Sequence, residues 1–301
     1  MKLLSTTKRF ADLARRRLRA PEKSSLLSGR LLAELVATKR DIRSLEDVEF
    51  QVFSQWGDDG IIQWLVRNVD FPNKTFIEFG VEDYTESNTR FLMMNNNWTG
   101  FIMDGSESSI QKIHQEQYFW RHDLTAKSVF IDKDNIDGLI ASTGFDREVG
   151  ILSTDIDGND YWVLQAIKSI DPVVLIVEYN SVFGIDRAIS VPYSPSFQRT
   201  QAHFSNLYFG ASLKAFHHIA SERGYAFLGC TAAGNNAYFV KRDRLNDQVK
   251  EVSLTEGFRE AKFRESRDKD GANTFISGSA RLDLIKGLPV INVETGQEEK
   301  L

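Results

Sequence analysis

The stretch from Phe76 to Asp104 constrains the fold more than any other part of the chain. It starts with a short apolar run that stops at Gly80, continues through Ser87 and Asn88, and ends with a second apolar run that closes on Asp104. Apolar, β-rich runs bounded by turn residues predict strands, and a segment opened by good N-cap residues predicts a helix. This stretch is therefore predicted to fold as strand, turn, helix and strand.

Gly80 and Asp104 stand where such a unit holds a nucleoside. A glycine turn lets a ligand approach the backbone because no Cβ intervenes, and an acid that ends the second strand can accept hydrogen bonds from both ribose hydroxyls. The dinucleotide fingerprint G-x-G-x-x-G is absent, since Val81, Glu82 and Asp83 follow Gly80. Acids at this turn would repel a pyrophosphate and attract a cationic ligand. S-adenosylmethionine has a sulfonium, an ammonium and no phosphate.

On these residues the chain resembles the class I S-adenosylmethionine-dependent methyltransferases, in which an acid-x-glycine turn ends the first strand and an acid ends the second. Within that class it is similar to the FkbM-like branch of bacterial sugar and natural-product O-methyltransferases. Three further strings support this resemblance, which covers about residues 50–240: Ser-Gln-Trp-Gly-Asp-Asp-Gly-Ile at 54–61, Gly-Ala-Ser-Leu at 210–213 and Gly-Asn-Asn-Ala-Tyr-Phe-Val at 234–240. The family usually has a second glycine where this chain has Glu82.

The chain continues the alternation of strands and helices beyond Asp104. Apolar runs predict later strands at 148–155, 172–180, 225–230 and 234–240. Alternating strands and helices build a doubly wound sheet that binds ligands beyond the carboxyl ends of its strands. We therefore predict an α/β fold with a doubly wound, seven-stranded, Rossmann-like methyltransferase sheet. The resemblance implies that its last strand is antiparallel, and a helical extension precedes it.

Three parts are predicted along the chain: a basic helical extension over 1–45, a methyltransferase-like domain over 46–243, and a charged extension over 244–301 that packs on the domain. The net charge of −5 argues against bulk recruitment of nucleic acid. The single cysteine, Cys230, excludes an intramolecular disulfide and suits a reducing cytoplasm, so we expect a cytoplasmic protein. No apolar run approaches the length of a bilayer span.

The first 22 residues are strongly basic, and their cations alternate with Phe10, Leu13 and Leu18. This pattern predicts an amphipathic helix. One interpretation is a peripheral contact with anionic lipid or with an acidic partner. The other, which we favour from the sequence, is a solvated helix that packs on the domain through its apolar stripe.

The resemblance implies roles for several residues at the cofactor. Glu78 and Gly80 would face the amino-acid end of S-adenosylmethionine, Asp104 would hold the ribose, and Asp123, taken as the acid after the third strand, would contact the adenine. The alternative is an ordinary strand–helix–strand unit without a cofactor. The remaining predicted cofactor-binding residues are Glu82, Asn88 and Gly105.

Acids and an amide from later strands should join Asp104 at the same sheet edge. In some class I O-methyltransferases an acid after the fourth strand and an acid–amide pair after the fifth hold a divalent cation, which here implies magnesium on Asp155, Glu178 and Asn180. Alternatively, Asp155 or Asp157 acts directly as a general base or orients the substrate. A third possibility is that Asp157 and its neighbours only form a turn.

The segment 181–208 is long and irregular, and it follows the fifth strand, so it should lie over the mouth of the site. We predict that His203 within it is catalytic, because its pKa lies in the useful range. A lone histidine in a loop is also often only a hydrogen-bonded surface residue.

The predicted function is transfer of a methyl group from S-adenosylmethionine to a hydroxyl of a small-molecule or glycan acceptor. The rival hypothesis is a catalytically inactive, methyltransferase-like binding or scaffolding module that residues 1–22 dock at a membrane. Glu82 favours the rival, because its side chain would crowd the methionine end of the cofactor.

Overall fold

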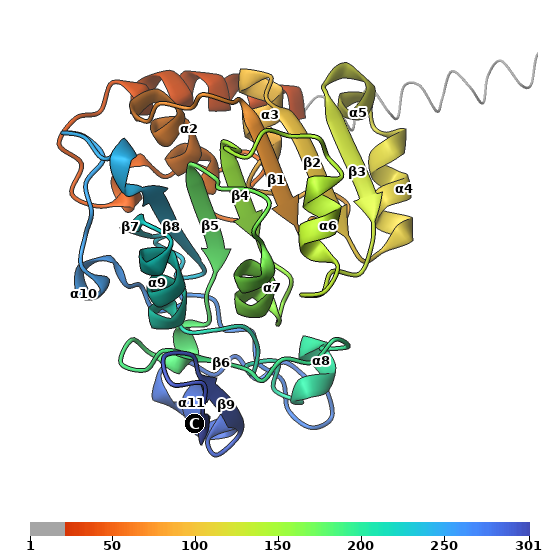
Figure 1. The fold of residues 1–301 in the computed structure, drawn as a ribbon, viewed down its shortest axis with the longest axis vertical. Coiled ribbons are helices and arrows are strands. Elements are labelled where there is room, and N and C mark those ends of the chain that lie inside the picture. The colour runs from red at the N-terminus through yellow and green to blue at the C-terminus, as the bar shows by residue number, and fades with distance from the viewer. Residues whose placement is uncertain (1–21) are drawn as a thin grey trace, which may run out of the picture.

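The computed structural model describes residues 22–301, so most of the predicted basic helix lies outside the described residues. A seven-stranded sheet forms the centre of the molecule, with the strand order β3-β2-β1-β4-β5-β8-β7 (Figure 1). β8 is antiparallel to both of its neighbours, and the other strand pairs are parallel. The predicted doubly wound, seven-stranded, Rossmann-like sheet with its last strand antiparallel is confirmed. The strands are β1 (Thr75–Phe79), β2 (Thr99–Asp104), β3 (Leu124–Ser128), β4 (Ile151–Thr154), β5 (Val174–Glu178), β7 (Tyr225–Cys230) and β8 (Asn236–Lys241).

Helices cover both faces of this sheet, as a buried parallel sheet requires. One face carries α2 (Asp58–Asn68), α3 (Arg90–Asn96), α4 (Glu107–Gln115) and α5 (Gln117–Arg121), and the other carries α6 (Ile136–Ala141), α7 (Asp160–Ala166) and α9 (Leu213–Glu222). Neighbouring strand residues alternate between the two cores: Ile176 lies in the first and Leu175 in the second. Apolar side chains on both sides of each strand therefore hold the three layers together.

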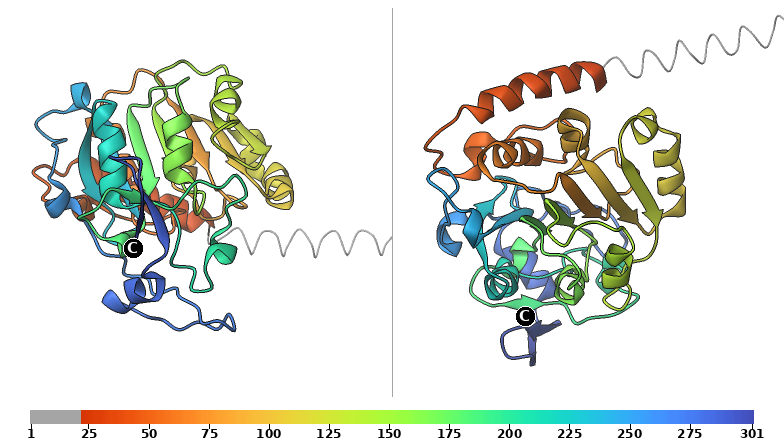
Figure 2. Two further views of the ribbon diagram at one scale, coloured as in Figure 1. Left: turned by 60° about the horizontal axis from the view of Figure 1, so that its bottom comes forward. Right: turned by 45° about the horizontal axis from the view of Figure 1, so that its top comes forward.

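A helix over residues 22–37 lies outside α2 and α3, and Figure 2 shows no other described element over it. No helix within residues 22–301 is both long enough and apolar enough to pass through a lipid bilayer.

A small second sheet and two short helices lie beyond the carboxyl ends of the central strands (Figure 1). The sheet has the order β10-β9-β6, so residues from the C-terminal extension pair with the segment that follows β5. The remaining elements are β6 (Ile189–Ser190), β9 (Pro289–Asn292), β10 (Glu298–Lys300), α8 (Arg199–Ala202), α10 (Leu254–Gly257), α11 (Ser279–Ile285), η1 (Leu45–Val48), η2 (Ser181–Phe183) and η3 (Arg242–Arg244).

The turn after β1 needs a glycine. Gly80 has φ of +70°, and a Cβ there would lie 1.5 Å from the backbone oxygen of Asp155. The turns after β1 and β4 therefore approach each other more closely than any side chain would allow. Glu82, two residues later, also has a positive φ, of 47°. This residue adopts the left-handed conformation that glycine prefers, at the position where the resembled family usually has its second glycine.

We expect Gly80→Ala to lower the free energy of unfolding by more than about 3 kcal/mol, because it combines a left-handed backbone with a clash against backbone. Chemical denaturation measures this. Gly144→Ala is the matched control, since Gly144 has φ of +71° and nothing within 4 Å of its Cβ position. It should lose only the roughly 1–2 kcal/mol of backbone strain. Equal losses in the two variants would contradict the close contact between the turns.

Candidate functional site

A pocket of about 700 Å³ opens at the carboxyl ends of β1, β2, β4 and β5. Three predicted residues, Asp123, Asn180 and His203, are not among the described residues that line it. The predicted residues that do line it are Glu78, Gly80, Glu82, Asn88, Asp104, Gly105, Asp155, Asp157 and Glu178. The sheet edge thus gathers acids from strands that are far apart along the chain.

Glu78 organises the entry into α3. Its carboxylate accepts hydrogen bonds from the Ser87 hydroxyl at 2.8 Å and from the Asn88 and Thr89 backbone amides at 2.8 and 3.1 Å. The Thr89 hydroxyl donates to it as well. Burial raises the pKa of Glu78 above its usual range, and these four donors oppose that rise. The carboxylate is thus occupied in shaping the turn over the pocket.

Asp104 fixes the turns on either side of it. One carboxylate oxygen accepts from the Glu82 amide at 2.8 Å, and the other accepts from the Ser106 amide at 2.7 Å. Each oxygen of an ionised carboxylate has about two acceptor sites, so each retains one for a ligand. The strand end therefore presents a fixed carboxylate with free acceptor capacity.

The expectation that Asp123 follows the third strand is wrong. β3 begins at Leu124, so Asp123 stands at its amino end, on the opposite edge of the sheet from the pocket. There its exposed carboxylate accepts from the Thr99 hydroxyl at 3.1 Å. The pocket instead meets the carboxyl end of β3 through the apolar residues Val129, Phe130 and Ile131.

Asp155, Asp157 and Glu178 form a compact acid group. One carboxylate oxygen from each lies within 4.8 Å of the others, and one oxygen of Glu178 is buried without a hydrogen-bond partner. Burial raises the pKa of Asp155 well above its usual range, and the charges of Asp157 and Asp160 raise it further. Burial raises the pKa of Glu178, and the charges of Asp155, Asp157 and Asp160 raise it further. Ionising all three carboxyl groups at this separation costs a large free energy unless a cation neutralises part of their charge.

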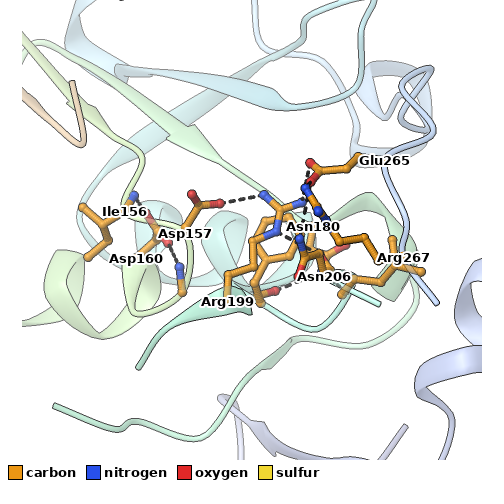
Figure 3. Close-up of polar contacts among 11 residues, drawn as sticks. Ile156, Asp157, Asp160, Asn180, Arg199, Asn206, Glu265 and Arg267 are labelled. Carbon is orange, nitrogen blue, oxygen red and sulfur yellow. Dashed lines mark hydrogen bonds and ion pairs between the residues drawn. The ribbon is translucent and has the colours of Figure 1, made fainter. Parts of the chain in front are cut away.

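Arg199 supplies one cation to this group, as Figure 3 shows. Its guanidinium donates to Asp157 at 2.6 Å and to the backbone oxygen of Asn206 at 2.8 Å. Its third nitrogen lies 3.6 Å from Glu265, and the guanidinium lies 3.8 Å from the centre of the Phe209 ring. These contacts hold Arg199 at the pocket wall with only 15% of its side chain exposed. It is the one Lys or Arg among the described residues that line the pocket.

Two polar residues near the acid group have structural partners. Asp160 accepts from the Ile156 and Gly158 amides at 2.8 and 2.9 Å, and so fixes the turn that carries Asp157. Burial raises the pKa of Asp160 to about 6. The side-chain amide of Asn180 donates to the backbone oxygens of Leu207 and Phe209, at 2.9 Å each. Its oxygen accepts from the Val182 amide. Asn180 thus anchors the loop after β5 and does not belong to the acid group.

His203 lies outside the pocket lining. Its ring nitrogen Nδ1 is 2.8 Å from the Ser205 hydroxyl, and its ring centre lies 4.3 Å from that of Phe204. Burial lowers the pKa of His203. These contacts place the imidazole in the loop after α8 and away from the acids, so the geometry does not support a general-base role.

Of the aromatic wall of the pocket, the sequence pointed only to the loop that carries Phe197. Trp56 and Phe263 stack with ring centres 6.4 Å apart and planes 22° apart, and Phe197 lies against Gly158. All three residues line the pocket together with Glu265. Phe263 and Glu265 come from the C-terminal extension. Its many charged residues form no pattern that predicts a position at the pocket. Trp56 belongs to the string at 54–61 that supports the family resemblance, and that string was the one hint for it.

No family model and no curated protein matches the chain. Similar solved structures include PKMT2 from Rickettsia typhi in complex with AdoHcy, which is 9% identical over 62% of this chain and 53% of that chain, with a TM-score of 0.39. The CurJ carbon methyltransferase is 13% identical over 78% of this chain and 70% of that one, with a TM-score of 0.37. The N-terminal domain of EvdMO1 with SAH bound is 9% identical over 55% and 72%, with a TM-score of 0.36. At these scores the likenesses carry no argument about function.

We expect Glu178→Gln to raise the melting temperature by a few degrees at pH 8 and to leave it nearly unchanged at about pH 3.5. A carboxyl whose pKa is raised by folding does not affect stability below the unfolded pKa, where both states hold the proton. As the pH rises past the unfolded pKa, the folded state of the native chain becomes progressively less stable. The glutamine side chain of the variant does not ionise, so the variant does not lose this stability. Thermal melts across pH, with a chelator present, measure the difference.

The exposed Glu294 supplies the control, because Glu294→Gln should not change the melting temperature at either pH. An increase for Glu178→Gln that is as large at low pH as at pH 8 would show that ionisation is not its cause.

Proposed function

We propose that this chain is an S-adenosylmethionine-dependent methyltransferase that methylates a hydroxyl oxygen of a sugar or small molecule. One observation carries the proposal: the Gly80 turn, Asp104 and the acid group of Asp155, Asp157 and Glu178 surround one pocket at the carboxyl edge of a methyltransferase sheet. A volume of about 700 Å³ suits a small-molecule site. The single cysteine, Cys230, is buried, which is compatible with a cytoplasmic location.

The residues near β1 and β2 suit the methyl donor, S-adenosylmethionine. Asp104 retains an acceptor site on each oxygen for the two ribose hydroxyls. Phe130 is half exposed beside Gly105 and offers an apolar face to a base. One oxygen of Glu78 accepts only the Asn88 amide and retains an acceptor site. Glu78, Glu82 and Glu86 are therefore the carboxylates on this side of the pocket that remain for the positive charges of the methionine end. A cofactor with phosphates would meet the same acids and be repelled.

The opposite wall suits a neutral, hydroxyl-rich acceptor. The stacked rings of Trp56 and Phe263 give it a flat apolar surface, and the buried indole nitrogen of Trp56 has no hydrogen-bond partner within residues 22–301. Arg199 is already neutralised by Asp157 and Glu265. An acceptor with phosphate groups would therefore find no unpaired cation here, whereas hydroxyls would find both donors and acceptors.

Asp155 and Glu178 are positioned to handle the proton that the acceptor hydroxyl loses. S-adenosylmethionine, when bound, would supply an activated methyl group for transfer to the acceptor oxygen. A carboxylate with a raised pKa is a better general base than an ordinary one. The chain otherwise acts by holding the two reactants in line within a walled pocket.

In the proposal the acid group also holds a divalent cation, and Asp155 and Glu178 act as direct bases only where that cation is absent. Asp155, Asp157 and Glu178 each offer one oxygen, and oxygen ligands suit Mg²⁺. The predicted ligand Asn180 is replaced by Asp157, since both polar atoms of the Asn180 side chain are engaged in the loop. A bound cation would lower the pKa of an acceptor hydroxyl.

We expect S-adenosylhomocysteine to bind the full chain in calorimetry, and Asp104→Asn to weaken that binding at least about tenfold, because it removes the charge from the ribose contact. Asp123→Asn is the matched control and should bind as the native chain does, since Asp123 lies at the other sheet edge. Absence of heat at high ligand concentration would contradict the proposal. It would favour the inactive binding module, for which the exposed Glu82 at the turn is the supporting observation.

We expect methyl transfer to stop when divalent cations are removed and to return with Mg²⁺. Asp155→Asn should abolish this recovery and should also weaken Mn²⁺ binding, measured by paramagnetic relaxation without substrates. Asp123→Asn should change neither. Unchanged turnover after thorough metal removal would eliminate the cation and leave Asp155 and Glu178 as direct bases.

A further inference from the structure

The helix over residues 22–37 is attached to the domain by one face only. Ala33 and Val36 on that face are buried, and Leu26 packs against the same apolar cluster as Phe53 and Phe91. Gly29 lets the two surfaces meet, because a Cβ there would lie 2.5 Å from the Val52 side chain. Glu22 adds an ion pair at 2.8 Å to Arg90, whose guanidinium lies over the Phe53 ring. The orientation of the helix is therefore fixed, and so is the face that it turns outward.

The outward face carries leucines at helical spacing. Leu27, Leu31 and Leu35 follow one another every four residues, so they lie along one side of the helix. Their exposed fractions are 61%, 70% and 62%, and Leu32 beside them is 37% exposed. Half of the exposed large apolar side chains in residues 22–301 stand on this helix. The right-hand view in Figure 2 shows the helix at the outer edge of the molecule, with no described element covering it.

The charge around this helix is opposite to that of the rest of the chain. The 21 residues that run directly into it hold seven Lys or Arg and a single Asp, although the whole chain carries −5. Within the helix itself Lys23 and Arg30 are equal in number to Glu22 and Glu34, so the positive charge comes from the segment that leads into it. Exposed leucines that follow a basic segment match an anionic lipid surface, because apolar burial and charge attraction then act together.

The basic leading segment argues against a second copy of this chain paired in parallel on this face. Two copies paired in that way through Leu27, Leu31 and Leu35 would bring their basic segments together. Those like charges would repel each other, and Glu34 is the one acid beside the leucines. An anionic lipid surface instead attracts the basic segment and can bury the leucines.

We propose that the leucine face of the helix over 22–37, with the basic segment that precedes it, docks this protein flat on an anionic lipid surface. Leu27, Leu31 and Leu35 insert between the headgroups, and the lysines and arginines contact them. The pocket opens at the carboxyl edge of the sheet, and no residue of this helix lines it. Docking therefore leaves the pocket accessible, and the proposal does not depend on the reaction catalysed there.

Vesicle flotation of the full chain tests the proposal. We expect binding to vesicles of phosphatidylcholine with 30% phosphatidylserine, at least fivefold less to phosphatidylcholine alone, and a decrease as salt is raised from about 0.1 to 0.5 M. The triple variant L27Q/L31Q/L35Q should lose at least fivefold in binding to the anionic vesicles. Its melting temperature should match the native one, because the three side chains are exposed.

The double variant F275Q/L282Q is the control. It removes exposed apolar side chains from the C-terminal part of the chain, and it should bind as the native protein does. The charge variant R15Q/R16Q/R17Q should weaken the binding and reduce its dependence on salt.

Three outcomes would overturn the proposal. The native chain could fail to float with anionic vesicles, or the triple leucine variant could bind as well as the native chain. Sedimentation could instead show a dimer that L27Q/L31Q/L35Q converts to a monomer, without any vesicle binding, and then the face would be an interface between copies.

Discussion

The site depends on the contact between the Gly80 turn and the backbone oxygen of Asp155. Parallel strands bring their carboxyl ends to one edge, but only a residue without a Cβ lets the loops after β1 and β4 touch there. That contact sets the distance between the Glu82 turn, which Asp104 holds, and the turn of Asp155 and Asp157, which Asp160 holds. The Glu82 turn and the acid group consequently face one pocket.

The acids of this protein divide into two kinds. Asp59 and Glu78 are buried, but their oxygens accept several hydrogen bonds that hold the loops over residues 52–54 and 87–89. Asp155 and Glu178 have far fewer donors and lie beside other acids, so burial and those charges together raise their pKa, and the group needs a proton or a cation. Carboxyls of the first kind stabilise the fold. The second kind is destabilising when ionised, which is the usual signature of a functional site.

The helix over residues 22–37 contacts the domain through one face only. Arg90 lies between the Phe53 and Tyr118 rings and pairs with Glu22, so the helix is attached to the loop whose neighbours Gln55 and Trp56 line the pocket. The buried face of this helix thus supports the wall of the site, and its leucine face remains available on the outside.

The sequence determined the strand and helix order, the glycine turn at Gly80 and the acids at strand ends, because these follow from local hydrophobic periodicity and turn chemistry. It misplaced Asp123, since the boundary of a short, half-exposed strand such as β3 is weakly encoded. It brought the loop that carries Arg199 to the mouth of the site, but it could not place Phe263 or Glu265 at the pocket, or His203 outside it. Those positions depend on how the loop after β5 and the C-terminal extension pack over the sheet edge, and such long-range packing leaves no periodic pattern along the chain.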